Sequence, residues 1–138
     1  MRSGMAREYV LDGSKISSLE AFYDQIGHKL APGADWGRNL DALDDFLGGG
    51  FGGPEGDFNL RWANSEISRA NLGYPETVRQ LQKRLEQCHP SNRDKVRAEL
   101  TRAENGLGAT VFDWLVEIIR RHDAAGDQSH DNIRLLLE

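Results

Sequence analysis

Residues 34–52, ADWGRNLDALDDFLGGGFG, contain a short amphipathic segment bounded by glycine turns. Its apolar residues recur at the three- and four-residue spacing that places side chains on one face of an α-helix; they are Leu40, Leu43 and Leu47. This spacing predicts a helix over residues 39–47 with a buried leucine face. The glycines at 48–56 predict a flexible loop, because the segment lacks the lysine and the strand–loop–helix setting of a phosphate-binding loop.

Three aspartates crowd a second face of the same predicted helix. At 100° per residue, Asp41, Asp44 and Asp45 lie within an arc of about 100°. Like charges three and four residues apart repel each other on a helix, so folding alone does not favour this arrangement. Two interpretations follow. Either the face is merely solvated, or its charge is meant for a cationic partner that is absent from the free protein.

Aromatic side chains flank the acidic face and favour the second interpretation. Trp36 stands in the turn before the predicted helix, and Phe51 lies in the glycine-rich loop after it. Large aromatic residues are common anchors of protein interfaces. Acidic and aromatic groups on one edge therefore predict a surface that docks into a basic cleft of another protein.

The composition is that of one globular domain without disulfides. The chain has 138 residues, of which 38% are hydrophobic, enough for a single core. Its formal net charge of −5 argues against a nucleic-acid partner and suits a basic protein. Cys88 is the only cysteine, which predicts a reducing compartment, the cytoplasm. No apolar run reaches the ~20 residues of a membrane span, so no membrane association is expected.

Strand-like and helical segments alternate along the chain, which predicts an α/β fold with a parallel sheet. The strands are expected at 7–13, 57–64 and 132–138. The apolar run Leu135–Leu137 predicts burial of the last strand on both faces. Further helices are expected at 18–30, opened by a Ser17–Glu20 capping box, at 65–72, as a hairpin over roughly 74–109, and at 110–122. The first six residues are expected to be a disordered lead-in to one domain over 7–138.

The sequence offers little support for an enzyme. The spacing of the histidines, His28, His89, His122 and His130, does not match a metal-binding motif, and no G-x-S-x-G motif is present. Each histidine is expected at the surface or near a helix end. Asp41 and Asp45 could act as a catalytic carboxylate pair, but the neighbouring sequence does not predict an apolar pocket that would raise one pKa. Neither a cofactor nor a metal is therefore expected.

The segment around the acidic helix resembles the barstar family of intracellular ribonuclease inhibitors. The family pattern is an aromatic residue followed by G-x-N-L-D-A-L-x-D-x-L. Here it is matched by Trp36, Gly37, Asn39, Leu40, Asp41, Ala42, Leu43, Asp45 and Leu47. The resemblance extends back to about Tyr9 and resumes around Trp62 and again from the last predicted helix, so it covers about two-thirds of the chain.

The resemblance implies a small three-stranded parallel sheet packed by helices. It implies that the binding surface is the acidic helix with the loops at its ends, and that Asp41 and Asp45 are the two acids that bind the ribonuclease. In the family, the second acid enters the phosphate site of the nuclease and meets arginines and a histidine there. The complex is expected to be 1:1, with the free protein a monomer.

Several positions depart from the family pattern. Asp35 stands where the family has an aromatic residue, and Asp44 stands where it has a tryptophan. An acidic residue of the family's last helix corresponds approximately to Arg121 here, and Glu117 lies one turn earlier. Phe51 is the nearest match to a family tryptophan after the acidic helix. The hairpin at roughly 74–109 is expected to be an insertion. These departures predict a partner other than barnase, with a more basic cleft.

Two functions remain open at this stage. The first is an inhibitor, or immunity protein, of a ribonuclease toxin. The second is a regulatory adaptor that binds another basic protein through the barstar-like scaffold and the inserted hairpin. Fold alone does not decide between them.

Overall fold

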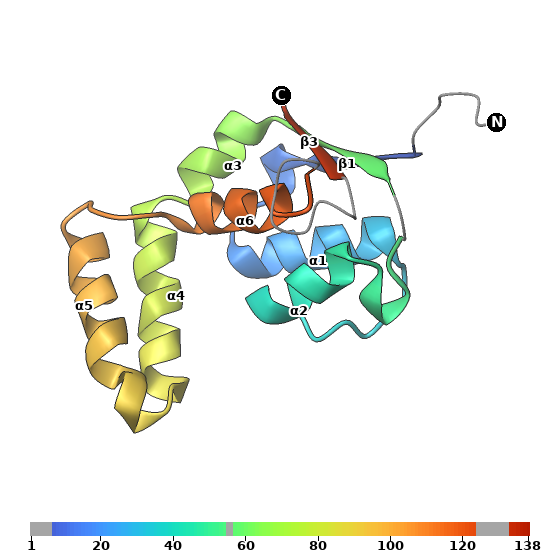
Figure 1. Ribbon diagram of the computed structural model, residues 1–138. Coiled ribbons are helices and arrows are strands. Elements are labelled where there is room, and N and C mark those ends of the chain that lie inside the picture. Colours follow the sequence, from blue (N-terminus) through green and yellow to red (C-terminus); the bar gives the residue numbers. More distant parts are fainter. Residues whose placement is uncertain (1–6, 55–56, 124–132) are drawn as a thin grey trace.

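The computed structural model describes residues 7–54, 57–123 and 133–138 and has a three-stranded sheet at one side of the molecule (Figure 1). The strands are β1 (Arg7–Asp12), β2 (Phe58–Ala63) and β3 (Ile133–Leu137). All are parallel in the order β1-β2-β3, with Leu11 opposite Trp62 and Leu60 opposite Leu135. The predicted α/β fold with a parallel sheet is confirmed. The predicted lead-in, residues 1–6, lies outside the described residues.

Six helices connect and cover the strands. They are α1 (Leu19–Leu30), α2 (Leu40–Leu47), α3 (Ser65–Asn71), α4 (Tyr74–Gln87), α5 (Arg93–Glu104) and α6 (Val111–Arg120). The predicted capping box of α1 is wrong. Ser18, not Ser17, caps this helix, because its Oγ accepts a hydrogen bond from the Ala21 N–H at 3.1 Å. Glu20 is thereby free to bind the hairpin.

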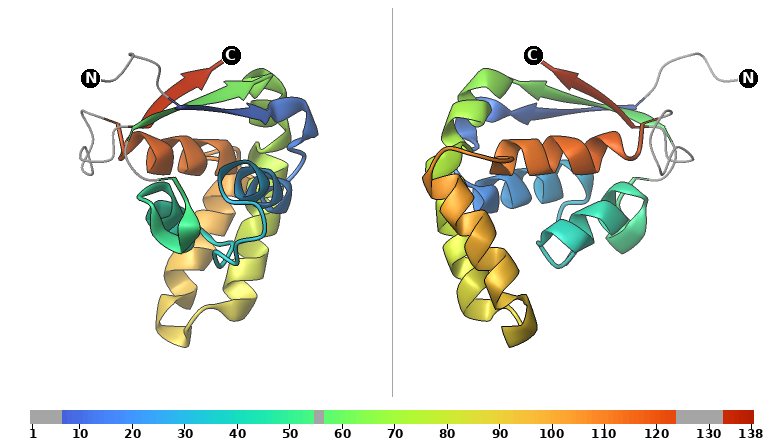
Figure 2. Two further views of the ribbon diagram at one scale, coloured as in Figure 1. Left: turned by 90° about the vertical axis from the view of Figure 1, so that its right-hand side faces the viewer. Right: turned by 60° about the vertical axis from the view of Figure 1, so that its left-hand side comes forward.

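The sheet is packed on one face only. Both views of Figure 2 show α1 and α6 beneath the sheet, with no described helix over its opposite face. In β2 the buried side chains alternate with half-buried ones, and Val10 of β1 is 39% exposed. The predicted burial of Leu135–Leu137 on both faces is wrong, since all three are half-buried. The reason is that β3 is an edge strand of a sheet with one open face.

Aromatic side chains fill the core between the sheet and the helices. The ring of Trp62 lies 5.3 Å from that of Phe22 in α1 and 5.1 Å from that of Phe112 in α6. Its indole N–H donates to Ser68 Oγ at 2.9 Å, so the buried polar atom is satisfied. The core thus joins the sheet to both helices beneath it and gives α2 a rigid support.

Helices α4 and α5 form the predicted helical hairpin, which projects from the body (Figure 1). Its two helices share a small apolar cluster of their own, in which the buried residues are Leu81, Leu100 and Ala103. A cluster this small gives the hairpin little independent stability. Its orientation therefore depends on contacts at its base. Its status as an insertion stays a prediction.

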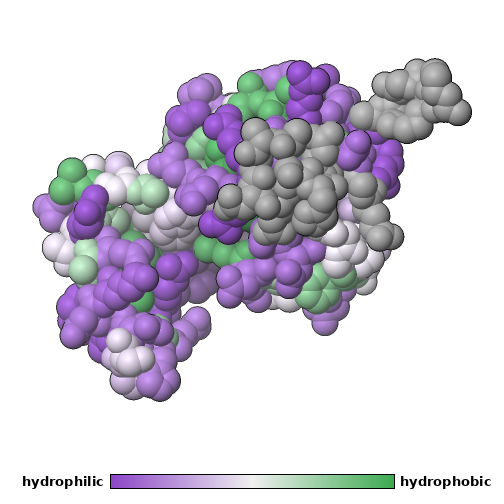
Figure 3. All heavy atoms as spheres, viewed as in Figure 1, coloured by the Kyte–Doolittle hydropathy of each residue, from purple (hydrophilic) through white to green (hydrophobic). Residues whose placement is uncertain are grey.

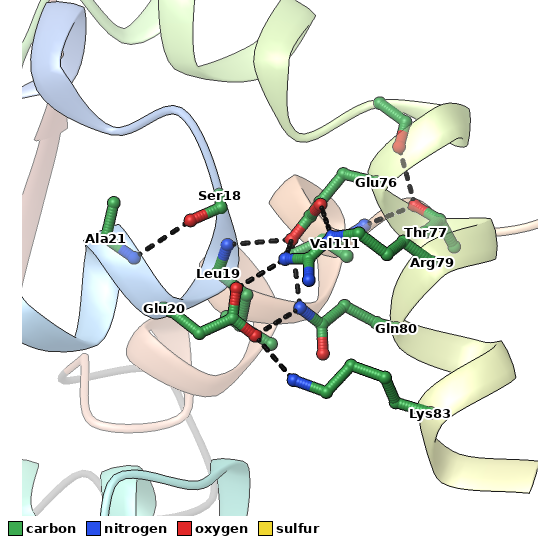
Figure 4. Close-up of polar contacts among 11 residues, drawn as sticks. Ser18, Leu19, Glu20, Ala21, Glu76, Thr77, Arg79, Gln80, Lys83 and Val111 are labelled. Atoms are coloured by element: carbon green, nitrogen blue, oxygen red, sulfur yellow. Dashed lines mark hydrogen bonds and ion pairs between the residues drawn. The ribbon is translucent and has the colours of Figure 1, made fainter. Parts of the chain in front are cut away.

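A polar network at the base of the hairpin fixes α4 to α1 and α6 (Figure 4). The carboxylate of Glu76, which is only 7% exposed, accepts hydrogen bonds from the Leu19 N–H at 2.9 Å and from Arg79 Nε at 2.7 Å. The Thr77 hydroxyl accepts from the Val111 N–H at 2.9 Å. Two helix N-termini, those of α1 and α6, are thus held by side chains of α4.

Glu20 of α1 completes this network. Its carboxylate binds Gln80 Nε2 at 2.8 Å, Lys83 Nζ at 2.9 Å, and the guanidinium of Arg79 (Figure 4). Partial burial would raise the pKa of Glu20, but these hydrogen bonds lower it to about 2. The carboxylate is therefore ionised at neutral pH and holds the hairpin through charge-assisted hydrogen bonds.

Candidate protein-binding site

The turn before α2 determines the orientation of the acidic helix. Gly37 has φ +92°, a backbone conformation that costs little only for glycine, and a Cβ there would lie 3.1 Å from Ala42 Cβ. Asn39 is the N-cap, and its Oδ1 accepts from the Ala42 N–H at 2.8 Å. Two residues of the barstar-like motif thus have a structural role. Both are also exposed, next to the first aspartate.

The two faces of α2 separate as their spacing predicts. Leu43 and Leu47 are buried at 0% and 1% exposure, and Leu40 is half-buried. Asp41 and Asp45 are exposed. Neither of these two aspartates forms a side-chain hydrogen bond or ion pair with any residue in the described part of the chain. They are therefore available to a cationic partner.

Asp44 differs from its two neighbours. Its Oδ1 lies 2.8 Å from His122 Nε2, and its side chain is only 25% exposed. Because an ionised carboxylate can only accept, the imidazole is the donor. His122, predicted at the surface or at a helix end, is 0% exposed. His122 directly follows the C-cap of α6, so its expected place near a helix end is confirmed, but it is not at the surface, because α2 packs across the end of α6 and covers it.

Trp36 is not an exposed anchor, and this prediction was also wrong. The side chain is 2% exposed and stacks on Phe46 of α2, with ring centroids 4.9 Å apart. Its ring and that of Tyr23 in α1 form a T-shaped pair with centroids 5.5 Å apart. Trp36 therefore positions α2 against α1 from inside the core. The sequence did not distinguish an aromatic residue of a turn that packs inward from one that packs outward.

Two other predicted site residues are accessible at opposite ends of α2. Asp35 is exposed before the helix, and Phe51 after it is 46% exposed. Phe51 has φ +58°, a left-handed conformation that is unfavourable for a bulky residue. Its ring is thus displayed next to the C-terminal end of the acidic helix.

The acidic helix forms one wall of a cleft of about 1210 Å³. Figure 3 shows the surface hollowed between the hairpin and the body. Asp41, Asp44 and Asp45 line the α2 side, and Trp114 and Glu117 of α6 lie between the two walls. The structure therefore places the predicted acidic face inside a concave surface.

Helix α4 of the hairpin forms the opposite wall. The guanidinium of Arg84 lies 5.2 Å from the ring centroid of Trp114, a cation–π distance, and Lys83 lines the same wall. Sequence reasoning did not find Arg84 and Trp114. They are distant in sequence, and only the docking of the hairpin brings them together.

Arg121 occupies the position where the resemblance places an acidic residue of the last helix, and it forms an ion pair. Arg121 lies 3.5 Å from Glu117, one turn earlier in α6, and both line the cleft. Tyr23, also on the cleft, is 7% exposed, and burial raises its pKa to about 12, so the phenol stays neutral. The charge available to a partner on this side therefore comes mainly from Asp41 and Asp45.

Within residues 7–54, 57–123 and 133–138, no three His, Cys, Asp or Glu side chains are grouped so that they could hold a metal ion. None of the helices there has the length and apolar character needed to cross a membrane. Cys88 is half-buried at the end of α4, with its Sγ donating to the Leu85 carbonyl at 3.6 Å.

The chain was compared with known families and proteins. A family model described as "Barstar (barnase inhibitor)" matches residues 6–101. Comparison with curated protein sequences gives no match. The family match includes β1, α1, α2 and β2 and ends within α5, so the resemblance of α6 and β3 stays a prediction. Since the match spans more than half of the chain and the motif residues lie within it, the chain belongs to the barstar family of barnase inhibitors.

Proposed function

We propose that this chain is an immunity protein, an intracellular inhibitor of a barnase-type ribonuclease, and that α2 blocks the active site of that enzyme. One observation carries the proposal. Asp41 and Asp45 are exposed on a rigid helix and have no side-chain partner among the described residues. An acidic face of this kind is suited to a basic protein in a 1:1 complex.

The chemistry of a ribonuclease explains why a carboxylate can block it. Such an enzyme must bind phosphate, which requires a pocket of cationic groups. A carboxylate on a rigid helix can occupy that pocket and accept charge-assisted hydrogen bonds from it. Asp45 is assigned this role, with Asp41 in support. Barstar itself is among the best-known examples of an interface dominated by one aspartate.

The support of α2 makes this recognition efficient. Its leucine face is buried, Trp36 stacks on Phe46, and Asp44 is bound to His122. A helix held in this way loses little conformational freedom on binding. Trp36 and Asp44 therefore contribute by positioning the helix, while Asp35 and Phe51 are available at the edge of the interface.

The test is inhibition of ribonuclease activity by the purified protein. Barnase is the first probe, since related ribonucleases share a cationic phosphate pocket; weak inhibition is expected from the departures at Asp35 and Asp44. Ribonucleases captured from the source cell are the second. Asp45→Asn should weaken binding by ~2–5 kcal/mol, because the cations of the enzyme remain buried and unpaired. Asp35→Asn is the matched control for loss of one exposed charge. Equal effects of the two changes, or no inhibition of any ribonuclease, would contradict the proposal.

A regulatory adaptor is the second candidate, favoured by the large hairpin wall opposite α2. It would bind a basic protein that is not a ribonuclease. Capture of such a protein, unaffected by Asp45→Asn, would support it.

A further inference from the structure

We infer that the hairpin is the second wall of the binding site, so that the partner inserts a protruding segment into the cleft and contacts α4 as well as α2. This inference rests on the proposed function and deepens it. The segment is predicted to be bipolar, with cationic groups toward α2 and a carboxylate toward Arg84. A flat surface laid on α2 alone would leave the hairpin untouched.

The first argument is that the two walls belong to one concavity. The three aspartates of α2 and the α4 residues Arg84 and Gln87 line the same cleft. Its volume of about 1210 Å³ is larger than the ~300–1,000 Å³ typical of small-molecule pockets, which suits a segment of polypeptide. Partner groups that reach Asp41 and Asp45 from within the cleft therefore pass close to α4.

The second argument is that the hairpin wall is held in place. Glu76 binds the N-terminus of α1, Thr77 binds that of α6, and Glu20 binds Lys83 across the base (Figure 4). These contacts connect α4 to the elements that also support α2. A preorganised wall can add affinity and selectivity without a large ordering cost.

The third argument is the opposite charge of the groups on the two walls that lack an ion pair in the described part of the chain. Arg84 is exposed, stacks on Trp114, and makes no ion pair within the described part of the chain. Its guanidinium can still donate to a carboxylate in the plane of the group. Facing it, α2 offers the carboxylates of Asp41 and Asp45. Glu99 of α5 also lines the hairpin side, and Arg38, paired with Asp24, lines the α2 side. Lys83 is already paired with Glu20. Arg84 is therefore the α4 cation of the cleft that is left to bind a partner carboxylate, while Asp41 and Asp45 are left to bind cations.

A neutral pair of variants tests whether the partner enters the cleft. Gln87→Trp places a bulky side chain on the cleft wall, and Gln82→Trp places it on an exposed part of α4 that does not line the cleft. With barnase as the probe, Gln87→Trp should raise the inhibition constant by about tenfold or more, and Gln82→Trp should leave it nearly unchanged. Equal constants for these two variants would overturn the inference.

A charged pair tests the role of Arg84. Simple attraction predicts that Arg84→Glu speeds association with a basic partner, because the cleft becomes more acidic. The inferred carboxylate contact predicts faster dissociation and weaker binding, again by about tenfold. Arg97→Glu, an exposed change on α5 outside the cleft, reports the long-range effect alone. Similar dissociation rates for the two variants would rule out the contact.

The outcomes separate this inference from the proposed function. If Asp45→Asn weakens inhibition while both hairpin pairs behave alike, α2 is the site and the hairpin wall is not part of it. If the unaltered protein leaves barnase and every ribonuclease captured from the source cell fully active at the highest concentrations tested, the proposed function fails, and the inference fails with it. Thermal melting of every variant verifies that each is folded.

Discussion

At the scale of single residues, several residues of the motif support the binding face through contacts with the rest of the protein. Asp44, which the sequence places on the acidic face with Asp41 and Asp45, is hydrogen-bonded to the buried His122. The backbone of His122 also accepts from the Ile133 N–H at 2.7 Å, so this residue joins the end of α6 to β3 as well as to α2. One buried residue, through its side chain and its backbone, thus connects three elements.

His122→Ala is therefore expected to lower the free energy of unfolding by about 1–3 kcal/mol, because it removes a buried hydrogen bond and leaves a cavity. Urea denaturation measures the change. His28→Ala, at an exposed position of α1, is the control and should be nearly neutral. Inhibition should also weaken, since α2 loses a support. A stability equal to that of the control would show that the Asp44–His122 contact contributes little.

Gly27 gives a second prediction at this scale. Alanine normally stabilises a helix interior relative to glycine by about 1 kcal/mol. A Cβ at Gly27, however, would lie 2.7 Å from Trp36 Nε1, in a closely packed core. Gly27→Ala is expected to destabilise the protein by about 1–3 kcal/mol, because Trp36 must move. Lys29→Ala, an exposed change in the same helix, is the control. A rise in melting temperature for Gly27→Ala would contradict the assigned packing.

At the scale of elements, the hairpin depends on a few ionised side chains at its base. Its own buried cluster is small, whereas Glu20 and Glu76 bind across to several neighbours. For Glu76, partial burial acts to raise the pKa, but hydrogen bonds outweigh it and lower the pKa; the donors are Arg79, the Leu19 backbone and Gln80. The position of α4 is therefore expected to depend on pH.

Lowering the pH should weaken the attachment of α4 to α1, over the pH range between the folded and the ordinary pKa of Glu20. The folded pKa of about 2 is below the ordinary value of 4.5, so the unfolded chain takes up the proton first as pH falls. The stabilisation is complete above 4.5 and is lost progressively toward about 2. Urea denaturation at neutral and at acidic pH should show that acid lowers the free energy of unfolding less for Glu20→Gln than for the unaltered protein. Glu104→Gln, an exposed change in α5, should not reduce the loss.

At the scale of the whole molecule, the net charge of −5 and the acidic wall of the cleft govern the encounter with a basic partner. Long-range attraction between exposed charges is screened over about 10 Å at 0.1 M salt. Contacts already buried in the complex are screened much less.

Added salt is therefore expected to slow association with a ribonuclease strongly and to change dissociation little. Stopped-flow kinetics over a range of sodium chloride concentrations measures both rates. Asp35→Asn should reduce the salt dependence of association without altering dissociation, since its charge is exposed. A dissociation rate that rises steeply with salt would mean that the contacts of the acidic face stay exposed to solvent in the complex, contrary to this prediction.

The sequence alone was sufficient for the parallel sheet, the helices and the two faces of α2. These features follow from local patterns: the leucine spacing and the alternation of strands with helices. Each depends on neighbours within a few residues, so periodicity predicts it. The family motif lies in the same local segment, which is why Asp41 and Asp45 could be selected in advance.

Only the tertiary structure decided which way certain side chains face. Trp36 packs inward, His122 is buried against Asp44, and β3 is an edge strand with one open face. The cleft itself, with Arg84 opposite the aspartates, exists because Glu20 and Glu76 hold the hairpin. These contacts join residues that are far apart in the chain, and no local spacing encodes them. Their geometry is set by the packing of whole elements, which is determined only when the complete chain folds.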